Sequence, residues 1–207
     1  MNMVNSKTKK MAETEPGEMV ELSLEMLHTY KETGYNPITR RIFIFGEINR
    51  DISYHFITAV ESMIVTSTEP IKLIINSPGG SVYDLFAIID YMKLVWDKYK
   101  IPIDVLAVGE AQSAAAIITI AATGRRKALK NTSIMLHEVQ SFSGYGSTST
   151  KKDDLKHTED LEERIIAVLI EKTKKKSIPY WKKELERKDK IYFPEEALKL
   201  GLIDEIL

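Results

Sequence analysis

Apolar positions along this chain follow two alternating spacings. Continuous apolar runs at 41–46, 71–76 and 103–108 are typical of strands that are buried on both faces of a sheet. Between these runs, over 51–66 and 82–99, apolar residues recur at the three- and four-residue spacing of one helix face. Strands that alternate with helices of this length predict a mostly parallel sheet covered by helices on both faces.

The second half of the chain continues the alternation around one stretch of small residues. After the strand at 103–108, a turn at Gly109 leads into the small and apolar residues 113–124, which predict a buried helix. The remaining elements expected are strands at 127–129 and 133–137, a long charged helix at about 152–175, and a C-terminal helix, Gly201 cap and strand over 194–206.

The N-terminal segment has a different character. Residues 1–18 are polar and charged and contain Pro16-Gly17, which predicts a partly disordered arm. Residues 18–30 have apolar positions near helical spacing and predict a short amphipathic helix, which Gly34 to Pro37 would end. We therefore divide the chain into an arm, 1–37, and one domain, 38–207.

Composition narrows the possible classes of function. The 207 residues carry a net charge of −1, which favours neither nucleic acid nor an anionic membrane as a partner. The absence of cysteine excludes disulfides and thiolate chemistry, and the longest apolar run, 114–122, is too short to span a bilayer. No histidine pair has metal-ligand spacing and no P-loop occurs, so we expect no metal, no bound cofactor and a cytoplasmic location.

Ser113 is the first candidate for chemistry. It lies at the mouth of the predicted buried helix, where backbone N–H groups lack intrahelical acceptors and the helix dipole is positive. Such a position suits a nucleophile beside an oxyanion site, although a serine there is more often a simple N-cap.

Two further segments follow predicted strands and should reach the same edge of the sheet. Ser77-Pro78-Gly79-Gly80 can form a tight turn that aims a free N–H group at an oxyanion. His137 ends an apolar strand, whereas His28, His55 and His157 lie in polar or helical contexts. Because sites in parallel sheets gather at the carboxyl ends of strands, we expect Gly80, Ser113 and His137 to converge.

Several segments together resemble the proteolytic subunit of the Clp protease, ClpP. The resemblance covers about residues 40–207 in one order and with similar spacing, and its motifs are Asn76–Ser81, Gly109–Ala114, the strand into His137, Lys188–Lys190 and 196–204. It implies the ClpP/crotonase fold, an α/β fold of stacked, mostly parallel sheets flanked by helices. An outlying helical handle would comprise Gly144–Ser149 and the helix that follows.

The resemblance also implies residue roles. Ser113 would be the nucleophile, His137 the general base and Asp189 the residue that orients it. The backbone N–H groups of Gly80 and Ala114 would form the oxyanion hole. The substrate would lie along Gly79, Gly80, Ser81 and Val82. The expected activity is that of a serine endopeptidase acting on unfolded proteins or peptides.

Assembly follows from the same resemblance. The chain would form a ring homo-oligomer, with two rings stacked through the handle, and would work with a separate AAA+ ATPase unfoldase that uses the ATP. Four features depart from the family pattern: Ala114 replaces methionine, Val139 replaces proline, Arg187-Lys188 replaces an acidic-basic pair, and the arm does not match the axial segment.

Other functions stay open at this stage. A crotonase-type acyl-CoA hydratase or isomerase would use the same fold but would need acidic residues near the oxyanion turn. A non-catalytic ClpP-like ring subunit would keep the fold as a scaffold, which the complete set of Ser113, His137 and Asp189 argues against. A relative of signal-peptide peptidases or phage prohead proteases is a third alternative, and Asp189 within a Clp-like C-terminus favours ClpP over it.

Overall fold

The structure is a computed structural model that describes residues 34–140, 147–175, 177–186 and 189–207. The predicted helix at 18–30, the glycine-rich segment from Gly144 and the pair Arg187-Lys188 lie outside the described residues. The elements in chain order are β1 (Tyr35–Asn36), β2 (Arg41–Phe45), α3 (Arg50–Ile64), β3 (Ile71–Ser77), α4 (Val82–Tyr99), β4 (Ile103–Gln112), α5 (Ala114–Ile120), β5 (Arg126–Ala128), β6 (Ser133–Leu136), α6 (Thr148–Lys172), α7 (Ile178–Leu185), β7 (Lys190–Tyr192), α8 (Pro194–Leu200) and β8 (Glu205–Ile206).

One sheet organises the described part of the chain. Its main path runs β1-β2-β3-β4-β5-β8, and β6 and β7 branch from it through β4. The pairings among β2, β3, β4, β5, β6 and β8 are parallel, whereas β1 and β7 pair antiparallel with β2 and β6. The predicted mostly parallel sheet is therefore confirmed. Strand β1 adds residues 35 and 36 to this sheet, N-terminal to the predicted domain boundary.

Strand β4 is the branch point of the sheet. Its first half pairs with β5 and its last three residues pair with β6. Between the two halves the register against β3 shifts, and Gly109 has a φ of +70°, a conformation that glycine adopts without steric cost. The predicted turn at Gly109 is wrong: the residue forms a bulge, and β4 continues through Gln112. The bulge redirects the strand, so that Ser113 follows directly on the branch toward β6.

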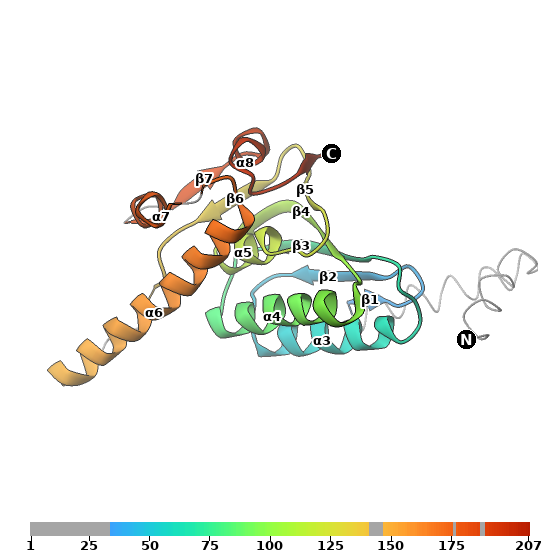
Figure 1. The fold of residues 1–207 in the computed structure, drawn as a ribbon, viewed down its shortest axis with the longest axis horizontal. Coiled ribbons are helices and arrows are strands. Elements are labelled where there is room, and N and C mark those ends of the chain that lie inside the picture. The colour runs from blue at the N-terminus through green and yellow to red at the C-terminus, as the bar shows by residue number, and fades with distance from the viewer. Residues whose placement is uncertain (1–33, 141–146, 176, 187–188) are drawn as a thin grey trace, which may run out of the picture.

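Helices cover the sheet and form the core with it. Helices α3 and α4 lie side by side (Figure 1), and each buries one apolar stripe, including Phe56 and Val60 of α3 and Ile88 and Met92 of α4. Helix α5 is buried along all seven residues. The small side chains Ala114, Ala115 and Ala116 let it pack closely in the core.

Helix α6 is the predicted handle. Its N-terminal part projects away from the body of the molecule (Figure 1), and its buried residues, Leu161, Ile165, Ile166 and Leu169, all lie in its second half. Near the middle of the helix, His157 Nε2 is hydrogen-bonded to the hydroxyl of Tyr83 in α4, 2.5 Å away. The handle is thus attached to the body through its C-terminal half and through the contact of His157 with Tyr83 in α4.

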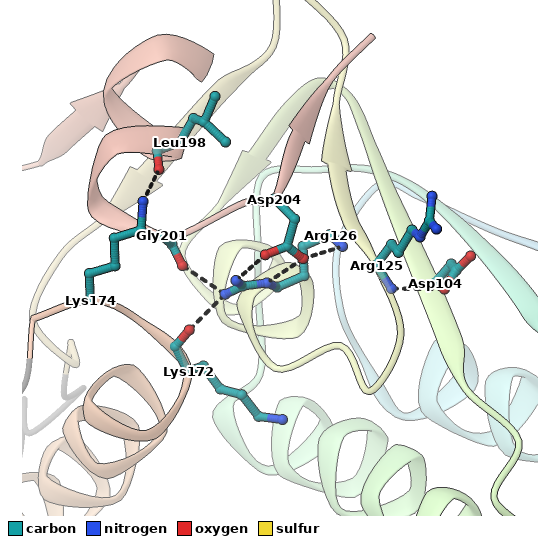
Figure 2. Close-up of polar contacts among 8 residues, drawn as sticks. All are labelled: Asp104, Arg125, Arg126, Lys172, Lys174, Leu198, Gly201 and Asp204. Atoms are coloured by element: carbon teal, nitrogen blue, oxygen red, sulfur yellow. Dashed lines mark hydrogen bonds and ion pairs between the residues drawn. The ribbon is translucent and has the colours of Figure 1, made fainter.

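Arg126 joins the base of the handle to the C-terminal end of the chain (Figure 2). Its Nη1 donates to the carbonyl oxygens of Lys172, at the end of α6, and Gly201, at the end of α8, at 2.8 and 2.7 Å. Its Nε donates to Asp204 Oδ2 at 3.0 Å, and its Nη2 is paired with the same carboxylate. One guanidinium therefore satisfies the terminal carbonyls of two helices and an acidic side chain before β8.

Candidate active site

Ser113 occupies a strained position between β4 and α5. Its backbone angles, φ +53° and ψ −121°, are unusual for a residue with a side chain. The surrounding hydrogen bonds hold it there, because its N–H donates to the carbonyl oxygen of Met135 at 2.8 Å and its carbonyl accepts from Ile117 at 3.2 Å. Ser113 is the N-cap residue of α5, but its side chain makes no capping hydrogen bond, so a simple capping role does not account for it. The Ser113 hydroxyl is therefore not used to cap α5, and it lies on a sharp strand-to-helix turn.

The predicted glycine turn lies directly against Ser113. A Cβ atom at Gly79 would stand 2.7 Å from Ser113 Cβ and 3.1 Å from the Ala114 nitrogen, and a Cβ at Gly80 would stand 2.2 Å from the carbonyl oxygen of Ile48. Both glycines have positive φ, +101° and +147°. Only glycine fits these two positions, and the structure brings the turn, Ser113 and Ala114 together as the sequence predicts.

The peptide groups of the turn are nearly all occupied. Gly79 donates its N–H to Ser77 Oγ at 3.1 Å and accepts at its carbonyl from Ile48 N–H at 2.7 Å. Ser81 donates its N–H to the Ile48 carbonyl at 2.8 Å. Gly80 is exposed, and its N–H donates to no acceptor among the described residues. Gly80 therefore has a free N–H group within the predicted substrate segment, and Val82 begins α4.

His137 follows β6 on the same side of the sheet as Ser113. The last residues of β4 pair with β6 in parallel, Gln112 opposite Met135, which brings the end of β6 beside the serine turn. The His137 side chain is half-buried, and its Nδ1 is buried without a hydrogen-bond partner among the described residues. A buried nitrogen without a hydrogen bond destabilises the folded state, so His137 stands out as a ring whose hydrogen bonding is incomplete.

Asp189 lies at the neighbouring strand end but does not contact the ring. Strand β7 is antiparallel to β6 with Leu136 opposite Lys190, so the next step of the register sets Asp189 across from His137. The Asp189 side chain is exposed, and no hydrogen bond between its carboxylate and His137 occurs among the described residues. The structure therefore brings the two residues to one sheet edge without joining them.

Strand β7 is fixed firmly just beyond Asp189. Tyr192 is fully buried and donates its hydroxyl to Glu184 of α7 at 3.0 Å, and Lys190 forms an ion pair with the same carboxylate at 3.2 Å. Burial, together with the adjacent carboxylate, raises the pKa of Tyr192 well above its usual value, so the hydroxyl stays a donor. Helix α7 thereby anchors the strand that follows Asp189, a link that the sequence did not predict.

A cleft of about 630 Å³ also reaches this edge of the sheet at the residue after His137. Glutamates outnumber lysines among the side chains that line the cleft. Lys182 forms an ion pair with Glu163, with 3.4 Å between Nζ and Oε1. The lining residues are Glu138, Glu159, Glu162, Glu163, Pro179, Lys182, Lys183 and Glu186. The cleft was not predicted because three of its lining residues belong to α7, whose apolar pattern is short.

Neither a metal site nor a membrane-spanning helix occurs among the described residues. Within residues 34–140, 147–175, 177–186 and 189–207, no group of three or more His, Asp or Glu side chains is placed to hold a metal ion. In the same ranges, no helix combines the length and apolar composition needed to cross a bilayer.

Comparison with known proteins identifies the class to which this fold and site belong. A family model described as Clp protease matches residues 28–207, and the mixed sheet with flanking helices fits the ClpP fold. The predicted fold class is thus confirmed. The chain belongs to the Clp protease family and is a peptidase.

Individual relatives agree with the family match. The chain is 35% identical over 187 residues to ATP-dependent Clp protease proteolytic subunit 2 of Frankia casuarinae, with 85% of this chain and 81% of the relative covered. It is 32% identical over 185 residues to proteolytic subunit 2 of Streptomyces coelicolor, covering 84% and 80%. It is 33% identical over 177 residues to proteolytic subunit 1 of Thermobifida fusca, covering 84% and 77%.

Proposed function

We propose that this peptidase is a serine endopeptidase with Ser113 as its nucleophile. The observation that carries the proposal is the strained, uncapped Ser113 pressed against a glycine turn whose exposed Gly80 N–H has no acceptor among the described residues. A serine hydroxyl attacks an amide only with help, so both a base and an oxyanion site must adjoin it.

His137 is the general base in this proposal. It takes the proton of Ser113 Oγ as the oxygen attacks the scissile carbonyl, and later gives the proton to the leaving amine. Its other ring nitrogen, Nδ1, is the buried atom without a partner among the described residues, and the β6–β7 register sets Asp189 across from His137. A carboxylate at Nδ1 would fix the ring tautomer and stabilise the imidazolium ion, which is the role we assign to Asp189.

The oxyanion of the tetrahedral intermediate would accept from the N–H groups of Gly80 and Ala114. Ala114 is the first residue of α5, and its N–H group belongs to the turn that lacks intrahelical acceptors. An extended substrate would pair with the carbonyl of Gly80, since the Gly80 N–H serves the oxyanion and the Gly79 carbonyl and Ser81 N–H already bind Ile48. Recognition by backbone hydrogen bonds gives little selectivity for side chains, which suits unfolded proteins and peptides.

We further propose that the chain works as a ring homo-oligomer, with two rings stacked through α6, and with a separate AAA+ ATPase unfoldase. The projecting half of α6 supports the stacking, since it leaves Leu155 exposed away from the core. The relatives are called proteolytic subunits of ATP-dependent proteases, and this sequence contains no P-loop with which to use ATP itself.

Labelling with a fluorophosphonate probe tests the nucleophile. The purified chain should form a covalent adduct on Ser113, located by mass spectrometry of the digested protein, and should hydrolyse a small fluorogenic peptide. Ser113→Ala should lose both properties, with a fall in kcat of about four orders of magnitude or more.

The matched control is Ser149→Ala, which removes an exposed serine at the start of α6 and should leave labelling and hydrolysis unchanged. Hydrolysis retained by Ser113→Ala would contradict the proposal. A wild-type chain that neither labels nor hydrolyses, but hydrates an enoyl-CoA, would establish the crotonase alternative instead.

A further inference from the structure

The glycine turn needs an external restraint if its free N–H group is to point in one direction. Gly79 and Gly80 both adopt positive φ, and glycine has the largest backbone freedom of any residue. An oxyanion donor acts by being held in place before the reaction, so a turn that moves would lose most of its effect. The contacts that hold this turn are therefore part of how the site works.

The restraint comes from two sources. Backbone groups of Ile48 bind the Gly79 carbonyl at 2.7 Å and the Ser81 N–H at 2.8 Å, and so hold the outer side of the turn. On the inner side, Ser77 Oγ accepts from Gly79 N–H at 3.1 Å. Across the described ranges, this is the side-chain hydrogen bond made to the peptide groups of Gly79 and Gly80, and it can be removed by a point substitution.

The position of Ser77 suits its hydroxyl to holding the Gly79 N–H. It is the last residue of β3, it pairs with Ala111 of β4, and it has 0% of its surface exposed. It cannot reach a substrate, and its oxygen already accepts a hydrogen bond, so it is no rival to Ser113 as nucleophile. A buried hydroxyl carried by a central strand gives the turn a rigid reference point.

We propose that Ser77 is a positioning residue for the oxyanion hole. Its hydroxyl holds the Gly79 N–H and so fixes the peptide plane before the one that carries the Gly80 N–H. Ile48 N–H holds the carbonyl of that second peptide, and the two bonds together keep the Gly80 N–H facing the carbonyl oxygen of the scissile bond. The inference deepens the proposed function and rests on it. It assigns to the serine of the Ser77-Pro78-Gly79-Gly80 motif an effect on the rate of reaction that is separate from its effect on folding.

The test compares two serines that are both buried. Ser77→Ala removes the bond to Gly79. Ser53→Ala is the matched control, because Ser53 is only 6% exposed and its hydroxyl bonds to Asp84 at 2.7 Å and to the Arg50 carbonyl, with no bond to the turn. Both changes delete one buried hydroxyl, so both should lower the melting temperature by a similar few degrees.

The kinetic constants separate the two variants. For Ser77→Ala we expect kcat on a fluorogenic peptide to fall about 10- to 100-fold with KM changed less than about twofold, and fluorophosphonate labelling of Ser113 to slow by a similar factor. Ser53→Ala should keep kcat. Ser77→Cys keeps the side-chain shape and a weak acceptor, so its kcat should lie between those of Ser77→Ala and the wild type.

Two results would overturn the inference. One is a kcat for Ser77→Ala within threefold of the wild type, and the other is an equal fall in kcat for Ser53→Ala. If Ser77→Ala does not fold, Ser77→Cys carries the same comparison. Failure of the proposed function is distinguishable, because it would appear in the wild-type chain as an absence of labelling at Ser113.

Discussion

Ser113 holds a backbone conformation that glycine would adopt more easily. Its angles are the mirror image of those at the second residue of a type II turn, a mirrored position where glycine is strongly preferred. We therefore predict that Ser113→Gly is more stable than Ser113→Ala by about 1 kcal/mol, because glycine relieves the strain and alanine keeps it. Urea denaturation of the two inactive variants measures the difference.

The comparison is controlled because both variants lack the hydroxyl and differ by one Cβ atom. An equal stability of the two variants would show that the turn is not strained. A larger stability for glycine would mean that the chain keeps a destabilising residue at this position, as proteins do where a strained side chain has a function.

The contact between Gly79 and Ser113 gives a second prediction at this scale. In Gly79→Ala the new Cβ would overlap Ser113 Cβ and the Gln112 carbonyl, both 2.7 Å away, and we expect a loss of about 2–4 kcal/mol in stability together with loss of hydrolysis. Gly46→Ala is the control, because Gly46 also has positive φ but no atom within 4 Å of the added Cβ. It should cost about 1 kcal/mol and keep the activity. Equal costs measured by denaturation would contradict the close contact.

At the scale of elements, the sequence predicts most of the sheet because each buried strand is a continuous apolar run. The convergence of Gly80, Ser113 and His137 was predictable for the same reason, since parallel strands present their carboxyl ends at one edge. The bulge at Gly109 was not, because it depends on the pairing of β4 with β6, which no local pattern records.

Other elements were missed for related reasons. Helix α7 has two buried residues, Trp181 and Leu185, too few to give a clear periodicity before the packing against α6 is known. Asp189 was expected near His137, but the antiparallel pairing of β7 that sets it across from the ring was not. Ile48 was missed because it acts through its backbone, so its side-chain type carries no signal.

The Arg126 contacts predict how stability depends on pH. Partial burial acts to raise the pKa of Asp204, but the hydrogen bonds and charge of Arg126 outweigh it and hold the pKa below its usual value. The contribution of this carboxylate is therefore present above the unfolded pKa, about pH 4, and is lost as pH falls through the lower pKa of the folded state. Asp204→Asn should lower the free energy of unfolding more at pH 7 than at pH 3.

Urea titrations at both pH values check this prediction. The matched control is Asp97→Asn, which removes a fully exposed carboxylate paired with Lys93 one helix turn away. Exposed pairs of this kind contribute little, so its effect at pH 7 should be the smaller. If Asp204→Asn destabilises equally at pH 3 and pH 7, the carboxylate is not held ionised by Arg126.

For the molecule as a whole, the proposed chamber predicts which substrates are cut. Enclosed serines would admit short or unfolded chains, and the chain has no P-loop of its own with which to unfold others. The purified protein should therefore hydrolyse a small fluorogenic peptide and leave a stable folded reporter intact over the same period. The same reporter, denatured and kept unfolded, is the control and should be degraded. Rapid degradation of the folded reporter without an ATPase would contradict the chamber.

The handle predicts how the assembly forms. Leu155 is 58% exposed on the projecting half of α6, where nothing in the described part of the chain covers it, and charged residues of both signs surround it. If two rings meet through these helices, Leu155→Asp puts a charge in an apolar contact and should shift the particles to half the mass, as measured by mass photometry. Val65→Asp is the control, since Val65 is 79% exposed at the end of α3, away from the handle, and should leave the mass unchanged.

Ionic strength gives the same contact a second readout. Contacts between charged helices are screened as salt is added, since the screening length falls from about 10 Å at 0.1 M to about 3 Å at 1 M. Double-ring particles should therefore become fewer at high salt in the wild type. A particle whose mass is the same for Leu155→Asp and the wild type at every salt concentration would show that α6 does not join two rings, and a chain that stays monomeric throughout would exclude the ring itself.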